Sequence, residues 1–196
     1  MWAFLTTMRR HCTRDRSPGP LQLSTPMPTF ITLPAMLVFP LLMAFAASSD
    51  LLTMRISNKL VLMVVASFFA IALLAGFSLE LLGTHVAAAT LVLAVSFSFF
   101  ALGWIGGGDA KLIAATALWF GFEDMLMYLL FASLLGGALT LLLLAVRRWP
   151  LPLQLKQVLW IDRLHDSKTG VPYGIALAAA GLLVYPSSLI FQRLVG

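Results

Sequence analysis

The chain has 196 residues, of which 60% are hydrophobic and only 11% are charged, and its mean hydropathy is +0.95. These values exclude a soluble globular domain and predict an all-α integral membrane protein. Its length suffices for a bundle of about six transmembrane helices of roughly 20 residues each. The formal net charge of +5 resides mainly in the N-terminal tail and the polar loops. That distribution is usual for membrane topology and predicts a lipid bilayer, not a nucleic acid, as the partner.

The chain begins with a segment that has no apolar periodicity. Residues 1–28 contain four arginines and four prolines, and we expect a disordered basic tail. Because Met27 adjoins the first apolar segment, the tail could be an extension of the gene model. Residues 29–196 are expected to form one membrane domain. The first predicted span is Thr29 to Ser49, although Ala44 to Ala46 also resembles a signal-peptide cleavage site.

Five more apolar segments follow, at residues 60–79, about 84–104, 110–122, 125–146 and 169–192. Polar turns separate them, and the longest loop covers 147–170. In the fifth segment, Gly136 and Gly137 predict close helix packing. His85, Trp119 and Tyr173 are expected at the membrane interface, where amphipathic rings gather.

Two acids lie beside these spans. Asp50 begins a polar turn that runs to Lys59, and Asp109 follows three glycines before the fourth segment. Two spans separate the acids, so both are predicted on the same side of the membrane. The loops after spans one, three and five carry Lys and Arg, whereas those after spans two and four carry none, which predicts the cytoplasmic side. The arginines of the tail oppose this orientation.

The fourth segment is too short to span the membrane alone. Thirteen helical residues cover about 20 Å, against a hydrocarbon core of about 30 Å. We expect the glycines at 106–108 to dip below the surface before the helix begins, which would place Asp109 in a watery cavity. The simpler alternative is that Asp109 only caps the following helix.

The pair of acids points to one kind of chemistry. An ionisable residue beside lipid is costly to keep and usually functional. Two carboxylates in one cavity can share a proton, so that one activates water while the other polarises a carbonyl, as in aspartic proteases. We expect no cofactor and no metal. Cys12 is the single cysteine, and the three histidines lack ligand spacing.

Three stretches resemble motifs of the type IV prepilin peptidases. The run from Asp50 to Asn58, Asp-Leu-Leu-Thr-Met-Arg-Ile-Ser-Asn, resembles their first catalytic motif. The run from Gly106 to Lys111, Gly-Gly-Gly-Asp-Ala-Lys, is similar to their second, the GxGD motif. Val171 to Ala176 resembles a third family feature at the start of the last helix. The resemblance covers residues 30–192, and the most similar subgroup is the small peptidases of tight-adherence (Tad/Flp) pilus systems.

The resemblance implies a function and a set of site residues. The protein would be an aspartic-type GxGD endopeptidase of the inner (cytoplasmic) membrane. It would remove the basic leader of Flp-type type IV prepilins or pseudopilins at the cytoplasmic face, as a step in pilus assembly and protein secretion. Its catalytic residues would be Asp50 and Asp109. Residues that would bind substrate or shape the loops are Arg55, Asn58, Gly106, Gly108 and Lys111. Larger relatives carry a cysteine-containing domain and methylate the new N-terminus; this sequence lacks that domain, so methyltransferase activity is not expected.

Two other classes remain open from the sequence alone. A transporter or channel could use paired intramembrane acids to carry protons or cations. It would normally show an inverted repeat or several interrupted helices, and the sequence shows neither. A non-catalytic membrane component of pilus assembly would not need both acids.

Overall fold

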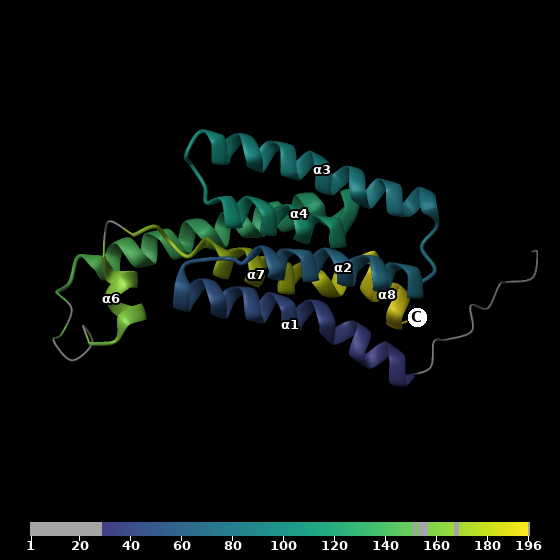
Figure 1. Ribbon diagram of the computed structural model, residues 1–196, viewed down its shortest axis with the longest axis horizontal. Coiled ribbons are helices and arrows are strands. Elements are labelled where there is room, and N and C mark those ends of the chain that lie inside the picture. The colour runs from purple at the N-terminus through teal and green to yellow at the C-terminus, as the bar shows by residue number, and fades with distance from the viewer. Residues whose placement is uncertain (1–28, 151, 153–156, 167–168, 196) are drawn as a thin grey trace, which may run out of the picture.

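The computed structural model describes residues 29–150, 152, 157–166 and 169–195. The predicted basic tail, 1–28, lies outside the described residues. Within them the chain forms helices joined by turns, with no strand (Figure 1). The predicted all-α membrane class is confirmed.

Helix α1, Thr29–Thr53, includes Asp50 in its last turn. The prediction of a polar turn beginning at Asp50 is therefore wrong. The helix continues because the backbone N–H of Met54 still donates to the Asp50 carbonyl at 2.8 Å. It ends at Met54, whose φ of 52° leaves the helical region. Helix α2, Asn58–Leu74, begins only four residues later, where the Ser57 side chain caps its first turn.

Helix α3, Leu79–Ala101, begins earlier than the sequence predicted. Ser78 caps its N-terminus by accepting from the Leu81 N–H, and the acidic Glu80 occupies the first turn. These polar residues belong to the helix start, not to the preceding loop. His85 therefore lies one turn into the helix, where it is buried with 3% of its surface exposed.

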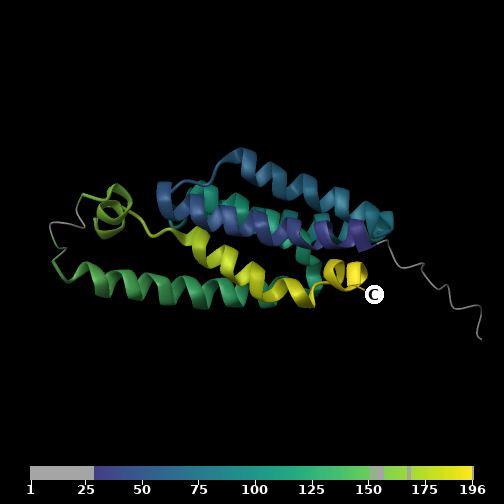
Figure 2. The ribbon, with the colours of Figure 1, turned by 90° about the horizontal axis from the view of Figure 1, so that it is seen from below.

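Helix α4, Gly107–Arg147, is interrupted at Gly121, whose φ is 59° and ψ is −162°. Ile113 and Leu129 both pack against one small apolar cluster. In a straight helix these residues would be about 24 Å apart. The chain therefore reverses at Gly121 into two antiparallel arms, as Figures 1 and 2 show. The arms, 107–120 and 122–147, correspond to the fourth and fifth predicted segments.

The last apolar segment is bent. Helix α7, Tyr173–Val184, continues through the short helix η1, Tyr185–Ser187, into α8, Leu189–Val195, at an angle of 49°. Within the predicted loop 147–170, the helix α6, Leu159–His165, was not expected.

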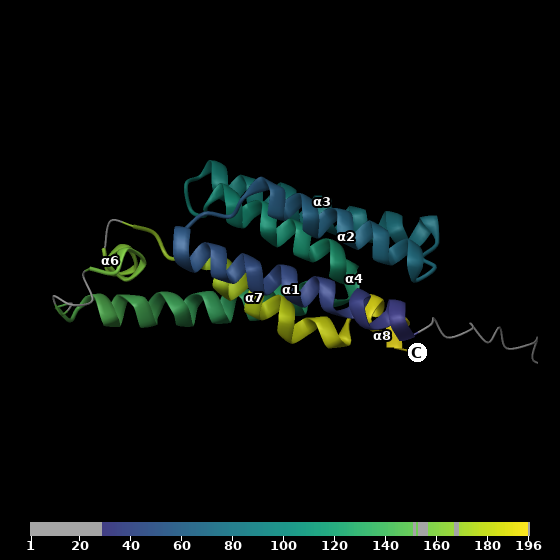
Figure 3. The same cartoon turned by 60° about the horizontal axis from the view of Figure 1, so that its bottom comes forward.

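Three described helices are long and apolar enough to cross a membrane, or four if the bent pair is one span. The shorter α2 is also apolar. Figure 3 shows α1 beside α7 along one edge of the bundle, with α2 and α3 along the other. The first arm of α4 lies between them, and its side chains provide the centre of the core.

Trp119, near the end of that arm, is fully buried and its indole N–H donates to the Val64 carbonyl at 3.1 Å. Its ring centroid is 4.8 Å from that of Phe39 of α1. His85 is also a core residue: its Nδ1 lies 2.8 Å from the Leu118 carbonyl oxygen. The prediction that Trp119 and His85 lie at the membrane interface was therefore wrong. Each has a polar ring atom that finds a buried backbone carbonyl, so burial costs little.

Candidate active site

The C-terminal end of α1 and the N-terminal ends of α4 and α7 meet at one end of the bundle (Figures 1 and 3). Asp50 of α1 and Asp109 of α4 both lie at this end, as the parity of the spans predicted. Ile56, in the turn between α1 and α2, packs against the N-terminal ends of both α4 and α7. Its Cβ is 3.1 Å from the position that a Cβ on Gly108 would take.

Asp50 is held by the N-terminus of α7. Its Oδ2 accepts a hydrogen bond of 2.7 Å from the N–H of Gly174, the second residue of that helix. Such an N–H has no partner within its own helix, so the carboxylate satisfies it. A Cβ on Gly174 would lie 2.8 Å from Asp50 Oδ2 and 2.9 Å from Ile56 Cδ1. Only glycine allows this approach without a shift, and Asp50 is left just 4% exposed.

Asp109 is held by its own helix. It is the third residue of α4, and its carboxylate interacts with the backbone of Gly106, the N-cap residue. An acid that reaches back to the N-cap backbone is one half of a capping box. A Cβ on Gly106 would lie 2.8 Å from Asp109 Oδ2. Each carboxylate thus lies against a glycine, and a Cβ on either glycine would require a shift of the carboxylate or of the helix.

The sequence predicted that the glycines at 106–108 form an irregular loop before the helix, and this prediction is wrong. The helix already begins at Gly107, so Gly107 and Gly108 are helical. Gly108 serves close packing instead, because a Cβ there would be 3.1 Å from the Ile56 Cβ, which is tighter than ordinary contact. The turn in the chain comes earlier, at Gly103, whose φ is 76°.

The two carboxylates act on each other. Asp50 lies close enough to Asp109 for an electrostatic interaction between the two carboxylates. Ile56 contacts the Cα side of both Gly108 and Gly174, so one side chain fixes the spacing of the two helix N-termini. Two interacting carboxylates titrate as a pair and can retain one proton between them. The arrangement can therefore provide a base and an acid together.

The other predicted site residues surround the pair. Lys111 donates from Nζ to Asn58 Oδ1 at 3.0 Å, in an exposed contact between α4 and α2. The Arg55 carbonyl accepts from the Ser49 and Thr53 hydroxyls, each at 3.2 Å. These contacts fit the interpretation of Asn58 and Lys111 as loop-shaping residues.

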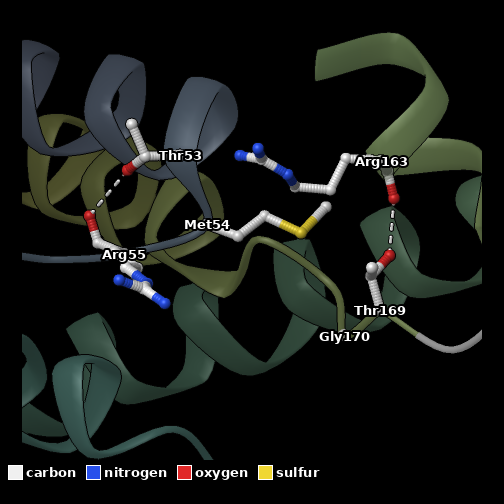
Figure 4. Close-up of a pocket in the computed structure, with 6 residues that line it drawn as sticks. All are labelled: Thr53, Met54, Arg55, Arg163, Thr169 and Gly170. Carbon is white, nitrogen blue, oxygen red and sulfur yellow. Dashed lines mark hydrogen bonds between the residues drawn. The ribbon is translucent and has the colours of Figure 1, made fainter. Parts of the chain in front are cut away.

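A cavity of about 670 Å³ adjoins the Asp50 end of α1 (Figure 4). Its lining residues are Thr53, Met54, Arg55, Arg163, Thr169 and Gly170. Arg163 donates to the Leu52 carbonyl at 3.1 Å, which links the α6 segment to α1. Two guanidinium groups make this cavity positive, so it disfavours a cationic peptide segment.

No local sequence pattern predicts the contact of Gly174 with Asp50, because 124 positions separate the two residues. The family resemblance at Val171 to Ala176 pointed to this region, but it assigned no role to Gly174. Ile56 lies within the first motif, but nothing in the sequence predicted that it packs against Gly108 and Gly174. Among the described residues, no group of three or more His, Cys, Asp or Glu side chains could hold a metal ion.

An apolar helical bundle with two acids meeting at one end defines a membrane protein with a paired-carboxylate site. The sequence model of the type IV leader peptidase family matches residues 37–141, which is more than half of the chain and includes both acids. No curated protein and no solved structure matches the chain. The chain belongs to the type IV leader peptidase family. It is therefore a membrane-embedded protease whose substrate is a prepilin.

Proposed function

We propose that the protein is an aspartic endopeptidase that uses Asp50 and Asp109 to cleave the basic leader from Flp-type prepilins or pseudopilins. The observation that carries this proposal is the meeting of two carboxylates from α1 and α4, each held by the backbone of a glycine. A structural acid needs no second acid beside it. Asp50 is buried and Asp109 is half-buried. Two such acids that share a site are costly to keep and fit catalysis best.

In the proposed reaction the pair carries one proton. The ionised carboxylate takes a proton from water as the water oxygen attacks the carbonyl carbon of the scissile peptide. The protonated carboxyl donates to the carbonyl oxygen, which gains negative charge. When the tetrahedral intermediate collapses, the C–N bond breaks and a proton passes to the leaving amine. The products are a leader with a free carboxylate and a pilin with a new N-terminal amine.

The remaining site residues act through position in this proposal. Gly106 and Gly108 permit the close approaches on which the placement of Asp109 depends. Asn58 and Lys111 connect α2 to α4. Arg55 shapes the turn between α1 and α2, where its carbonyl accepts from the Ser49 and Thr53 hydroxyls.

The site is proposed to face the cytoplasm from the inner membrane. Arg55, Lys59 and Lys111 all lie at the end of the bundle that holds Asp50 and Asp109. Two described cations of the predicted 147–170 loop, Arg147 and Arg163, lie at the same end. Cytoplasmic loops of membrane proteins carry such an excess of Lys and Arg. A leader that remains in the cytoplasm while its apolar helix enters the membrane would then present the scissile bond at this end.

The test is cleavage of an Flp-type prepilin by purified Asp50→Asn and Asp109→Asn variants. An amide cannot accept and return the proton, so each variant should lose roughly a hundredfold to ten-thousandfold in kcat. Glu123→Gln is the matched control, because Glu123 is exposed and lies near Gly121, at the opposite end of the bundle. A chelator should change nothing. Near-normal turnover by either Asn variant would contradict the proposed mechanism.

A further inference from the structure

A second cavity of about 480 Å³ opens on the flank of the bundle, between α3 and the second arm of α4. The first arm of α4 contributes Ile113 to its lining. Its rim is exposed, with Leu91 at 51% and Val95 at 48%, whereas Val92 and Ala132 are buried. We call this cavity the flank groove. It falls within the range of about 300–1,000 Å³ that is usual for binding sites.

Part of the lining of the flank groove lies beside the residues that hold the two acids. Tyr173, at one end, precedes Gly174, which holds Asp50. Ile105, also in the lining, precedes Gly106, which holds Asp109. Ser96 donates from Oγ to the carbonyl of Ala110, the residue after Asp109, at 3.1 Å. Two lining residues are therefore chain neighbours of the glycines that hold the carboxylates, and a third is bonded to the residue after Asp109.

Apart from the Tyr173 hydroxyl, the lining offers almost nothing polar to a ligand. No charged residue lines the groove. The Ser133 hydroxyl donates to its own helix, to the Leu129 carbonyl at 2.7 Å, and the Ser96 hydroxyl is bonded to backbone in the same way. A basic leader is therefore excluded from this groove by desolvation, and from the arginine-lined cavity by charge. The only part of a prepilin that fits is its apolar segment.

Resting on the proposed function, we propose that the flank groove binds the apolar helix of the prepilin immediately after the scissile bond. Along α3 the lining runs from Leu91 to Phe99, and along α4 from Met125 to Ser133. Each stretch covers about 12 Å, or about two helical turns. Two turns of a substrate helix in this groove would bring its cytoplasmic end, and the scissile bond, to Asp50 and Asp109. A lipid tail would fill the same apolar groove, but it has no bond that must be placed beside Asp50 and Asp109.

The test fills the groove from its exposed rim. Ser133→Phe places a ring in the groove without entering the core, and Ala138→Phe places the same ring on the same arm, at an exposed position outside the groove. Ser133→Phe should raise KM for the full prepilin by about tenfold or more, with Ala138→Phe near wild type. Both should cleave equally well a short peptide that contains the leader and scissile bond but no apolar helix. Equal KM values for the full prepilin would overturn the proposal.

A second measurement does not depend on the folding of a filled variant. A photo-crosslinking amino acid at Val95, in an Asp109→Asn background that retains bound precursor, should crosslink to the apolar segment of the prepilin. The same probe at Phe97, which is exposed outside the groove, should not. Crosslinks from Val95 to lipid alone in the presence of precursor would overturn the proposal. An active Asp109→Asn variant would instead contradict the proposed catalytic pair, so the two failures are distinguishable.

Discussion

Each carboxylate of the proposed pair lies against a glycine at a helix N-terminus. Gly174 belongs to α7 and holds Asp50 across the bundle, whereas Gly106 belongs to the same helix start as Asp109. Both contacts place an anion where a helix has unpaired N–H groups. Because the carboxylates are fixed by backbone and not by flexible side chains, their orientation does not depend on another rotamer. The glycines are therefore as necessary to the geometry as the acids.

The sharpest residue-scale prediction is that Gly174→Ala lowers kcat. The added Cβ would lie 2.8 Å from Asp50 Oδ2 and 3.0 Å from Asp50 Cβ, so the carboxylate or α7 must shift. A shift of about 1 Å at a catalytic group can cost about a hundredfold in rate. Cleavage kinetics at matched protein levels would measure the loss. Gly137→Ala is the control, because nothing lies within 4 Å of its Cβ position.

A retained kcat in Gly174→Ala would mean that Asp50 is not held by α7 during catalysis. A loss of protein from the membrane in both alanine variants would point to general intolerance of the added methyl group.

The pair of acids also predicts how the rate depends on pH. Activity needs one proton on the pair, because water attack requires a base and the carbonyl oxygen requires an acid. At low pH both groups are neutral and the base is lost; at high pH both are ionised and the acid is lost. A plot of kcat/KM against pH should therefore be bell-shaped. A rate that rises to a plateau without falling would show that a single ionised carboxylate suffices.

At the scale of elements, the apolar segments were predictable and their ends were not. Twenty-residue apolar runs have one stable form in lipid, so the helices follow from composition. Asp50, Asn58 and Glu80 were assigned to turns because they are polar, yet each lies inside a helix. Polar residues at a helix end satisfy its unpaired backbone groups, so polarity alone does not mark the end.

Gly121 is the residue on which the path of α4 depends. Its φ of 59° with ψ of −162° lies in a region open essentially to glycine alone, and a Cβ would be 3.0 Å from the His85 ring. We expect Gly121→Ala to cost about 1–3 kcal/mol of stability from backbone strain, and more from the contact with His85. Thermal unfolding in detergent should show a lower Tm.

Gly76→Ala is the comparison for that variant. Gly76 also has a positive φ, 68°, but nothing lies within 4 Å of its Cβ position. It should lose less stability than Gly121→Ala, since only the backbone is strained. Equal losses would show that the His85 contact adds nothing.

At the scale of the whole molecule, the sequence predicted that the two acids meet but not what surrounds them. Counting the spans between Asp50 and Asp109 was enough to bring them to one end, because each span reverses the direction of the chain. The contact of Gly174 with Asp50 and the flank groove depend on how three helices pack. Packing depends on the shapes of side chains far apart in sequence, which no local pattern records.

The orientation of the bundle predicts which end can be labelled from outside the cell. The second arm of α4, residues 122–147, covers about 39 Å as a helix, more than the hydrocarbon core of about 30 Å. Glu123, near its start, and Leu159, just beyond its end, should therefore lie on opposite sides of the membrane. Leu159 lies at the end of the bundle that holds Asp50 and Asp109, because Arg163 of the same short helix donates to the Leu52 carbonyl of α1.

In a Cys12→Ser background, an impermeant maleimide added to intact cells should label Glu123→Cys and not Leu159→Cys. Both cysteines should be reactive once the cells are lysed, since Glu123 and Leu159 are both exposed. Prepilin cleavage by each variant would show that it has folded in its native orientation. The reverse pattern, with Leu159→Cys labelled in intact cells, would place Asp50 and Asp109 outside the cytoplasm. The carboxylates would then lie across the membrane from the proposed position of the leader, and leader removal at the cytoplasmic face would be ruled out.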